Sequence, residues 1–307
     1  MNTDKLRFKE VTLGDKPLFD EHFSRLSPEH TLLSFATLYT WRSVNSLRYC
    51  HFDDTILIAV TGGIAVTGGR FSETSPLIIL TCTERFEERV AVLIEYFERN
   101  GGSASFLLMS EELSKKFLAT AGDRYSVKED RDNFQYIYET EKMIKLSGPE
   151  YHHKRNRTNR FKSSYDYSFE PLTDKNAPEC MTLFLEKLNN KGDNGYLETV
   201  LSDGFKHHSA LGLKGLVMRV SGEAAGFAFG GALSPEMAYI SQLMANTEFA
   251  GAYPFLYQTF IKEYCGGHPF VNLEEDLGLP GLRKLKLSYH PVRFTVSYIG
   301  RATRVPS

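Results

Sequence analysis

Apolar residues in this chain recur with the two-residue period of strands in some stretches and with the helical period in others. The first half contains predicted strands at 6–11, 49–52, 56–60, 64–66, 77–80, 105–109 and 134–138, and predicted helices at 15–26, 84–99, 110–119 and 141–146. The second half contains predicted strands at 213–220, 224–233, 237–245 and 270–273, and predicted helices at 180–188, 196–208, 254–264 and 282–288. The order hairpin, third strand, helix, strand, helix therefore appears twice. This repetition predicts two α/β halves with mixed sheets.

The joint between the halves is predicted at Gly148-Pro149, because these two residues end a helical pattern. We therefore expect one domain over residues 1–148 and another over residues 149–307. The sequence contains no low-complexity segment that would mark a different boundary.

A basic segment opens the second half. Residues 151–162 contain five Lys or Arg and no acidic residue. As a helix, the segment would place Tyr151, Thr158, Phe161 and Tyr165 on one side and His153, Asn156 and Arg160 on the other. One interpretation is a solvated basic helix. The other is an anion-binding helix that holds phosphates through Lys154, Arg155 and Arg160.

Composition limits the classes of function. The 307 residues are 42% hydrophobic and 13% aromatic, as in soluble globular proteins, and 36 Lys and Arg nearly balance 38 Asp and Glu. That balance argues against a surface that coats nucleic acid, although a local basic patch is compatible with it. The four cysteines are scattered, the N-terminus lacks the apolar run of a signal peptide, and the longest aliphatic run, 56–60, is too short to cross a bilayer. We therefore expect a cytoplasmic, metal-independent protein with no transmembrane segment.

The two halves differ in the loop before the long helix. In the first half this loop contains Glu84 and no glycine, whereas in the second half it contains Gly251 between alanines. Small residues before a helix N-terminus allow a phosphate to approach the unpaired N–H groups. A single glycine is equally compatible with a loop that binds no phosphate.

A strand near the C-terminus is followed by three carboxylates, at positions 274–276, and then by Arg283, Lys284 and Lys286. These charges could form an internally compensated network, for example between Glu274 and Arg283. Alternatively, a carboxylate acts as a general base on an amine while Tyr289 protonates a leaving group.

Three stretches resemble a known family: residues 151–161, residues 272–278 (Asn-Leu-Glu-Glu-Asp-Leu-Gly) and residues 281–291. Together with residues 33–42, they resemble a bacterial family grouped with the C-terminal domain of phosphatidylglycerol lysyltransferase. The resemblance covers nearly the whole chain. It implies two tandem domains of the GNAT acyltransferase fold, an arrangement shared with the Fem-type peptidoglycan aminoacyltransferases.

The resemblance also implies site residues. The pantetheine of an acyl donor would bind backbone groups of Leu243, Met244 and Ala245, and its pyrophosphate would bind Ala250, Gly251 and Ala252, with Tyr253 completing the cofactor site. Tyr289 would be the general acid, and Glu274 and Asn272 would complete the catalytic group. The usual glycine-rich phosphate loop is reduced here to Gly251 with Ala252.

The expected function is transfer of an activated acyl group from acyl-CoA, with coenzyme A as the cofactor, to an amine acceptor. The alternative donor is an aminoacyl-tRNA, whose phosphates would bind Lys154, Arg155 and Arg160. A third hypothesis is a degenerate pair of domains that binds a nucleotide or a protein without catalysis. Only the second half is expected to bind the donor.

Overall fold

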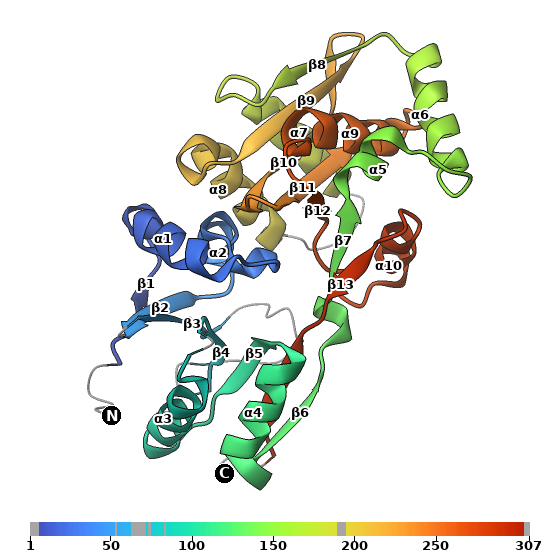
Figure 1. Ribbon diagram of the computed structural model, residues 1–307. Coiled ribbons are helices and arrows are strands. Elements are labelled where there is room, and N and C mark those ends of the chain that lie inside the picture. Colours follow the sequence, from blue (N-terminus) through green and yellow to red (C-terminus); the bar gives the residue numbers. More distant parts are fainter. Residues whose placement is uncertain are drawn as a thin grey trace.

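The computed structural model contains two seven-stranded mixed sheets with helices against their faces (Figure 1). It describes residues 6–52, 54–62, 72, 75–82, 84–188 and 195–303. The first sheet has the order β1 (Lys9–Glu10), β2 (Leu47–Phe52), β3 (Thr55–Val60), β4 (Leu77–Leu80), β5 (Ser105–Met109), β14 (Tyr298–Ala302), β6 (Tyr125–Glu129). The second has the order β13 (Arg293–Thr295), β7 (Gln135–Glu139), β12 (Phe270–Asn272), β11 (Met237–Ala245), β10 (Glu223–Ser234), β9 (Lys214–Val220), β8 (Tyr167–Pro171). The predicted α/β class with mixed sheets is confirmed.

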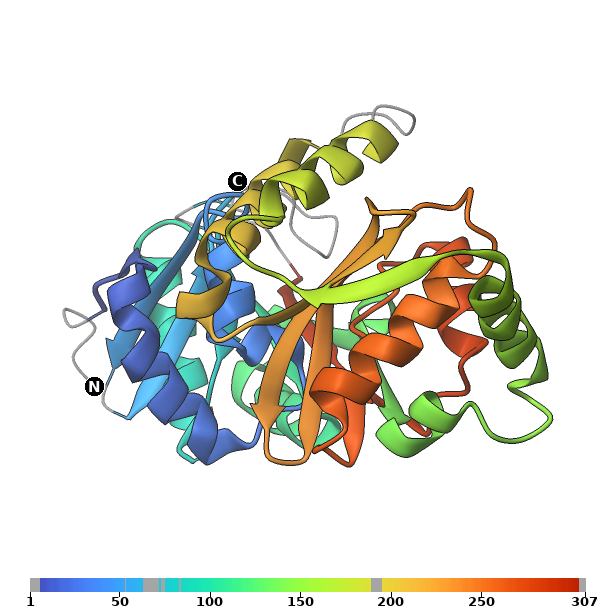
Figure 2. The same cartoon turned by 90° about the horizontal axis from the view of Figure 1, so that it is seen from above.

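The helices cover both faces of these sheets. They are α1 (Lys16–Leu26), α2 (Phe35–Trp41), α3 (Phe86–Arg99), α4 (Glu111–Ala121), α5 (Thr140–Lys145), α6 (His152–Ser164), α7 (Ala177–Leu188), α8 (Gly195–Leu211), α9 (Ala252–Phe260) and α10 (Pro280–Leu287). Helices α3 and α4 pack on the outer face of the first sheet, and α5, α6 and α9 on the outer face of the second. Between the sheets, Phe19 of α1 and Phe35 of α2 share one core with Phe205 of α8 and Phe227 of β10 (Figures 1 and 2). The two halves are therefore joined by a common apolar core.

Local sequence patterns located most elements to within a few residues. The helix predicted at 84–99 is Phe86–Arg99, and the strands predicted at 105–109 and 237–245 have those bounds. The strand predicted at 64–66 lies outside the described residues. Strands β6, β8, β13 and β14 were not predicted.

The sheets do not divide the chain at the predicted boundary between residues 148 and 149. Strand β7 precedes that boundary but pairs with β12 and β13 in the second sheet. Strand β14, at the C-terminal end, lies between β5 and β6 in the first sheet. Each half therefore supplies a strand to the sheet of the other, which local periodicity does not reveal.

The second sheet opens between β11 and β12. Parallel pairing joins only Met237–Tyr239 to Phe270–Asn272, whereas β11 continues to Ala245 with β10 as its partner. Alternate backbone N–H and C=O groups of residues 241–245 therefore face the opening. The residues on which the resemblance places the pantetheine of an acyl donor, Leu243, Met244 and Ala245, lie in this stretch.

Candidate functional site

The predicted pantetheine residues lie on the open edge of β11. Leu243 and Met244 are half-buried, and Ala245 is buried. Because this stretch pairs with β10 on one side only, its other edge can hydrogen-bond an extended ligand. The role of Leu243, Met244 and Ala245 in donor binding stays a prediction.

The predicted pyrophosphate loop is covered by α6. The N–H of Ala250 donates to the hydroxyl of Tyr165 at 3.2 Å. Gly251 has a φ of +95°, and a Cβ at this position would lie 2.2 Å from the carbonyl oxygen of Arg157. Glycine is therefore required here for close contact between α6 and the N-terminus of α9. In this conformation the carbonyl of Arg157 and the Tyr165 hydroxyl occupy space that a phosphate would need.

The three predicted phosphate-binding cations lie in different surroundings. Lys154 Nζ lies 2.8 Å from Ser288 Oγ and 3.8 Å from the ring centroid of Tyr289. Burial, assisted by the charge of Arg157, lowers the pKa of Lys154 to about 8. Arg155 donates to the carbonyls of Leu146 and Gly148, so it holds the loop that follows α5. Arg160 is exposed.

Tyr289, the predicted general acid, is 2% exposed. Its ring lies 5.6 Å from that of Tyr257 on α9, and its carbonyl accepts a hydrogen bond of 2.7 Å from Tyr151. Burial raises the pKa of the Tyr289 phenol well above its usual value. The phenol therefore stays protonated but is a weaker acid than a free tyrosine, and its role as the general acid stays a prediction.

The turn after β12 presents Glu274 in a left-handed backbone conformation, with a φ of +62°. The N–H of Glu274 donates to Asn272 Oδ1 at 2.6 Å, and its carbonyl accepts from the N–H of Tyr136 at 3.2 Å. A positive φ is uncommon for a residue with a side chain and indicates a position fixed by its surroundings. Burial, with the charge of Glu275, raises the pKa of Glu274 well above its usual value. Its carboxyl group therefore keeps its proton to a higher pH than a free glutamate does.

Asn272 is fully buried and its amide positions the turn. Its Nδ2 donates to the carbonyl of Glu29 at 2.7 Å and to Gln135 Oε1 at 2.8 Å. The N–H of Thr31 donates to the same oxygen of Gln135 at 3.1 Å. Asn272 thus ties Glu274 to the first half of the chain.

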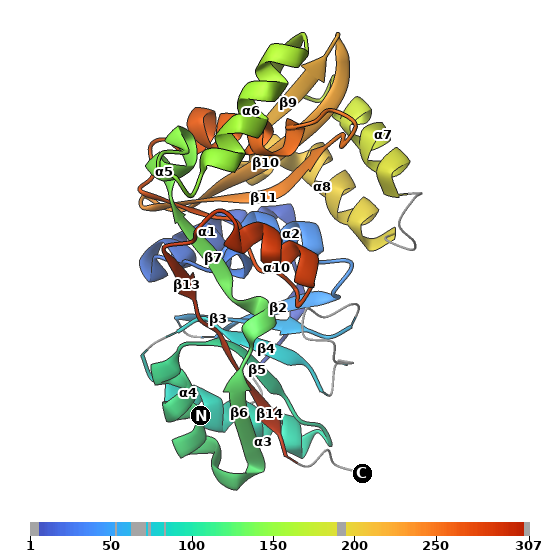
Figure 3. The ribbon, with the colours of Figure 1, turned by 90° about the vertical axis from the view of Figure 1, so that its right-hand side faces the viewer.

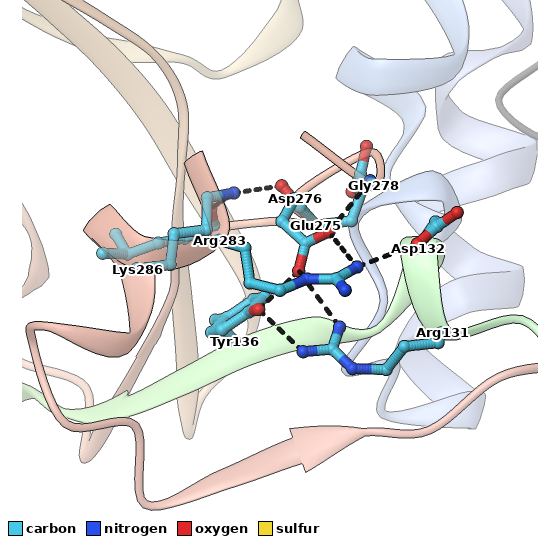
Figure 4. A network of polar contacts seen from close by, with 9 residues as sticks. Arg131, Asp132, Tyr136, Glu275, Asp276, Gly278, Arg283 and Lys286 are labelled. Atoms are coloured by element: carbon cyan, nitrogen blue, oxygen red, sulfur yellow. Dashed lines mark hydrogen bonds and ion pairs between the residues drawn. The ribbon is translucent and has the colours of Figure 1, made fainter. Parts of the chain in front are cut away.

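The predicted pairing of Glu274 with Arg283 is not found; Arg283 pairs with Asp276 instead (Figure 4). The guanidinium donates twice to the fully buried Asp276, from Nε and Nη2, each at 2.8 Å. Arg131 at 3.0 Å and the hydroxyl of Tyr136 complete the network. Burial alone would raise the pKa of Asp276, but hydrogen bonds from Arg283 and Tyr136 outweigh it and lower that pKa well below its usual value.

Lys286 supports the same turn from beneath. It is 6% exposed, and its ammonium donates to the carbonyl of Leu273, at 2.6 Å, and to that of Glu275. Burial lowers the pKa of Lys286, and the neighbouring carboxylates oppose that effect. Sequence reasoning missed this role, because nothing in the local sequence marks Lys286 as buried.

Within the described ranges, no group of three or more His, Cys, Asp or Glu side chains could hold a metal ion. Nor does that part of the chain contain a helix both long and apolar enough to cross a membrane.

Comparisons with known proteins place these features in context. The family described as phosphatidylglycerol lysyltransferase, C-terminal, matches residues 23–299. A conserved protein of unknown function from Bacteroides thetaiotaomicron VPI-5482 is 26% identical, with a TM-score of 0.87, over 97% of this chain and 100% of its own. The L-PGS structure from Bacillus licheniformis is 14% identical, with a TM-score of 0.64, over 94% of this chain and 93% of its own.

FemX is 9% identical, with a TM-score of 0.58, over 97% of both chains. At such low identities the likenesses to L-PGS and FemX concern the fold alone, and they match the expected tandem GNAT arrangement. A search of curated protein sequences found no match.

Proposed function

Because the chain belongs to the family of phosphatidylglycerol lysyltransferase C-terminal domains, we propose that it transfers an aminoacyl group from an aminoacyl-tRNA to an amine acceptor. The donor's ester carbonyl would lie in the splay beside Leu243 and Met244. The cationic face of α6 would hold phosphates of the tRNA acceptor end.

The observation that carries this choice of donor is the contact between α6 and α9. Acyl-CoA would need the N-terminus of α9 for its pyrophosphate, yet the carbonyl of Arg157 lies 2.2 Å from the Cβ position of Gly251. Opening that site would require α6 to move together with Phe161, whose ring lies 5.2 Å from that of Phe255 in the core. An aminoacyl-tRNA has no pyrophosphate to place there.

The outer face of α6, unlike the N-terminus of α9, carries exposed cations that would hold phosphates of a tRNA. Arg157, Arg160 and Lys162 are exposed, and residues 151–165 contain no acid. Helix α6 lies on the side of the molecule that faces the viewer in Figure 3. Cations on such a surface bind nucleic-acid phosphates through release of counterions.

The proposed chemistry uses two proton transfers. The acceptor nitrogen attacks the ester carbonyl, the new C–N bond forms, and the bond to the ribose oxygen breaks. Glu274 takes the proton that the nitrogen loses, and Tyr289 supplies the proton that the ribose oxygen gains. The Tyr289 ring lies 5.6 Å from that of Tyr257 on α9.

A binding experiment separates tRNA from coenzyme A as donor. We expect wild-type protein to bind aminoacyl-tRNA with steep salt dependence, and calorimetry with CoA to show no binding. Changing Arg157, Arg160 and Lys162 to Glu should reduce the slope of log K against log salt by about two, at roughly 0.7 per lost phosphate contact.

The control changes three cations of the first half to Glu: the exposed Arg99 and Lys115, and the half-buried Lys116. It should leave tRNA binding unchanged. Tight binding of CoA with no binding of tRNA would contradict the proposal and favour acyl-CoA as the donor.

A further inference from the structure

Lys154 on α6 is an amine without a counter-ion. It is half-buried, and no carboxylate of the described residues lies within ion-pair distance of its Nζ. That nitrogen instead lies 2.8 Å from Ser288 Oγ and 3.8 Å from the ring centroid of Tyr289. Lys115 and Lys145, by contrast, each pair with a glutamate one helical turn away. Lys154 is therefore held beside the predicted general acid without a negative charge to stabilise its protonated form.

The contact with Ser288 leaves the nitrogen free to react. The Ser288 hydroxyl donates to the carbonyl of Leu285 at 2.6 Å, so its oxygen accepts from Lys154 and its single proton is already used. A neutral lysine amine can make this bond with one N–H and keep its lone pair. Burial lowers the pKa of Lys154 to about 8, so about half of these amines are neutral at pH 8.

Lys286 is the other described lysine whose pKa is lowered, and burial is again the cause. It is 6% exposed, and its Nζ donates to the carbonyls of Leu273 and Glu275. A nitrogen enclosed in this way has no path to a donor. Among the described lysines, Lys154 is thus the one that combines a lowered pKa with partial exposure.

The proposed mechanism places the donor close to this amine. Tyr289 supplies the proton that the ribose oxygen gains, so the ester must lie within hydrogen-bond reach of its hydroxyl, about 2.6–3.2 Å. Lys154 Nζ lies over the ring of the same tyrosine. An ester in that position is therefore near both the proton donor and an internal nucleophile.

We propose that Lys154 is a site of self-acylation, at which the protein accepts the aminoacyl group when no external acceptor is bound. The inference rests on the proposed function. The neutral Nζ attacks the ester carbonyl, the new C–N bond forms, and the bond to the ribose oxygen breaks. Tyr289 gives its proton to that oxygen and regains the proton that Nζ loses. The products are an amide on Lys154 and a tRNA with a free ribose hydroxyl.

The modification would limit the protein's own activity. An amide is far less reactive than the ester from which it forms, so the acyl group stays on Lys154. Acylation also removes the positive charge of the side chain and adds bulk beside Tyr289. Self-acylated protein should therefore transfer to external acceptors more slowly than unmodified protein.

Peptide mass spectrometry tests the proposal after incubation at pH 8 with bulk tRNA charged with radiolabelled amino acids. Label on Lys154 should exceed label on Lys115 at least about tenfold. The pairing with Glu111 raises the pKa of Lys115, so less than about 1% of its amines are neutral at that pH. Lys154→Arg should remove the label while keeping the cation. Lys162→Arg, on the same helix and over the ring of Phe255 at 4.9 Å, should leave Lys154 labelled.

Hydroxylamine as an external acceptor separates this inference from the proposed function. If a hydroxamate forms faster with the protein than without it and Lys154 stays unlabelled, self-acylation is wrong and the proposed function stands. If neither product forms, both are wrong. Equal labelling of Lys154 in protein unfolded by urea would mean that the site contributes nothing, which also overturns the inference. Mapping of the wild-type peptide does not depend on any variant, and circular dichroism checks that Lys154→Arg is folded.

Discussion

Replacing Asp276 with Asn tests whether this buried carboxylate holds the turn beside Glu274 in place. Asp276 is 0% exposed. It accepts two hydrogen bonds from Arg283, each of 2.8 Å, and one of 3.0 Å from Arg131. The Tyr136 hydroxyl also donates to it. Asn keeps the shape of the side chain but removes the charge, so both guanidinium groups lose their shared counter-ion.

The magnitude follows from burial. Removing one partner of a fully buried ion pair costs about 3–5 kcal/mol. Here Arg131 and Arg283 remain 36% and 32% exposed, so water can solvate each guanidinium after the change. We therefore expect the low end, about 3 kcal/mol, or a loss of roughly 6 °C in Tm at about 2 °C per kcal/mol.

Urea unfolding followed by circular dichroism and by the fluorescence of Trp41 measures the change. Asp132→Asn is the matched control, because Asp132 is 57% exposed and accepts from the same Arg283 at 2.8 Å. An exposed pair of this kind contributes less than about 1 kcal/mol. If the two variants lose equal stability, the reasoning about burial is refuted.

The pH dependence gives an independent check with a definite sign. Burial raises the pKa of Asp276, but the hydrogen bonds from Arg283 and Tyr136 lower it more, so the folded-state pKa lies below the unfolded one. The group therefore contributes stability above the unfolded pKa, about 3.9, and that stability is lost as the pH falls through the folded pKa. The difference between wild type and Asp276→Asn should shrink correspondingly below about pH 4.

Three further substitutions test the site. Tyr289→Phe should lower the single-turnover transfer rate about 10²–10⁴-fold with unchanged donor affinity, and an unchanged rate would reject Tyr289 as the acid. Glu274→Gln should abolish most transfer and raise Tm relative to wild type at pH 8 but not at pH 4. The pKa of Glu274 is higher in the folded than in the unfolded protein, so wild type loses stability as the pH rises, whereas the Gln variant does not titrate at this position. An equal Tm difference at both pH values would contradict this explanation. Gly251→Ala should cost clearly more stability than Gly101→Ala in thermal unfolding, because both have positive φ but only Gly251 meets a carbonyl, that of Arg157. Equal losses would mean that the contact between α6 and α9 adjusts freely.

The sequence predicted which side of the basic segment faces the core, because that orientation follows from local helical periodicity. The side of the basic segment predicted to face the core carries Tyr151, Thr158, Phe161 and Tyr165; the first three are buried and Tyr165 is half-buried. The side predicted to face solvent carries His153 and Arg160, and both are exposed. Helical periodicity alone fixes these orientations, because the helix must bury one stripe.

Contacts between distant segments could not be predicted in this way. The sequence suggested Glu274 as the partner of Arg283, but the turn gives Glu274 a positive φ and directs Asp276 toward Arg283 instead. Nothing near Gln135 in the sequence marks it as a partner of Asn272. The placement of β7 in the second sheet and of β14 in the first could not be predicted for the same reason. Periodicity shows that a segment is a strand, but not which sheet it joins.

The first half has a structural reason to be present even if it binds no donor. Strand β7 joins β12 to β13 in the second sheet, so residues 149–307 alone would leave both strands without their common partner. The turn that carries Glu274 is also held from the first half, through the carbonyl of Glu29 and the amide of Gln135. A site positioned from both halves stays accurate only while they keep one relative arrangement, and the apolar core between the sheets enforces that arrangement.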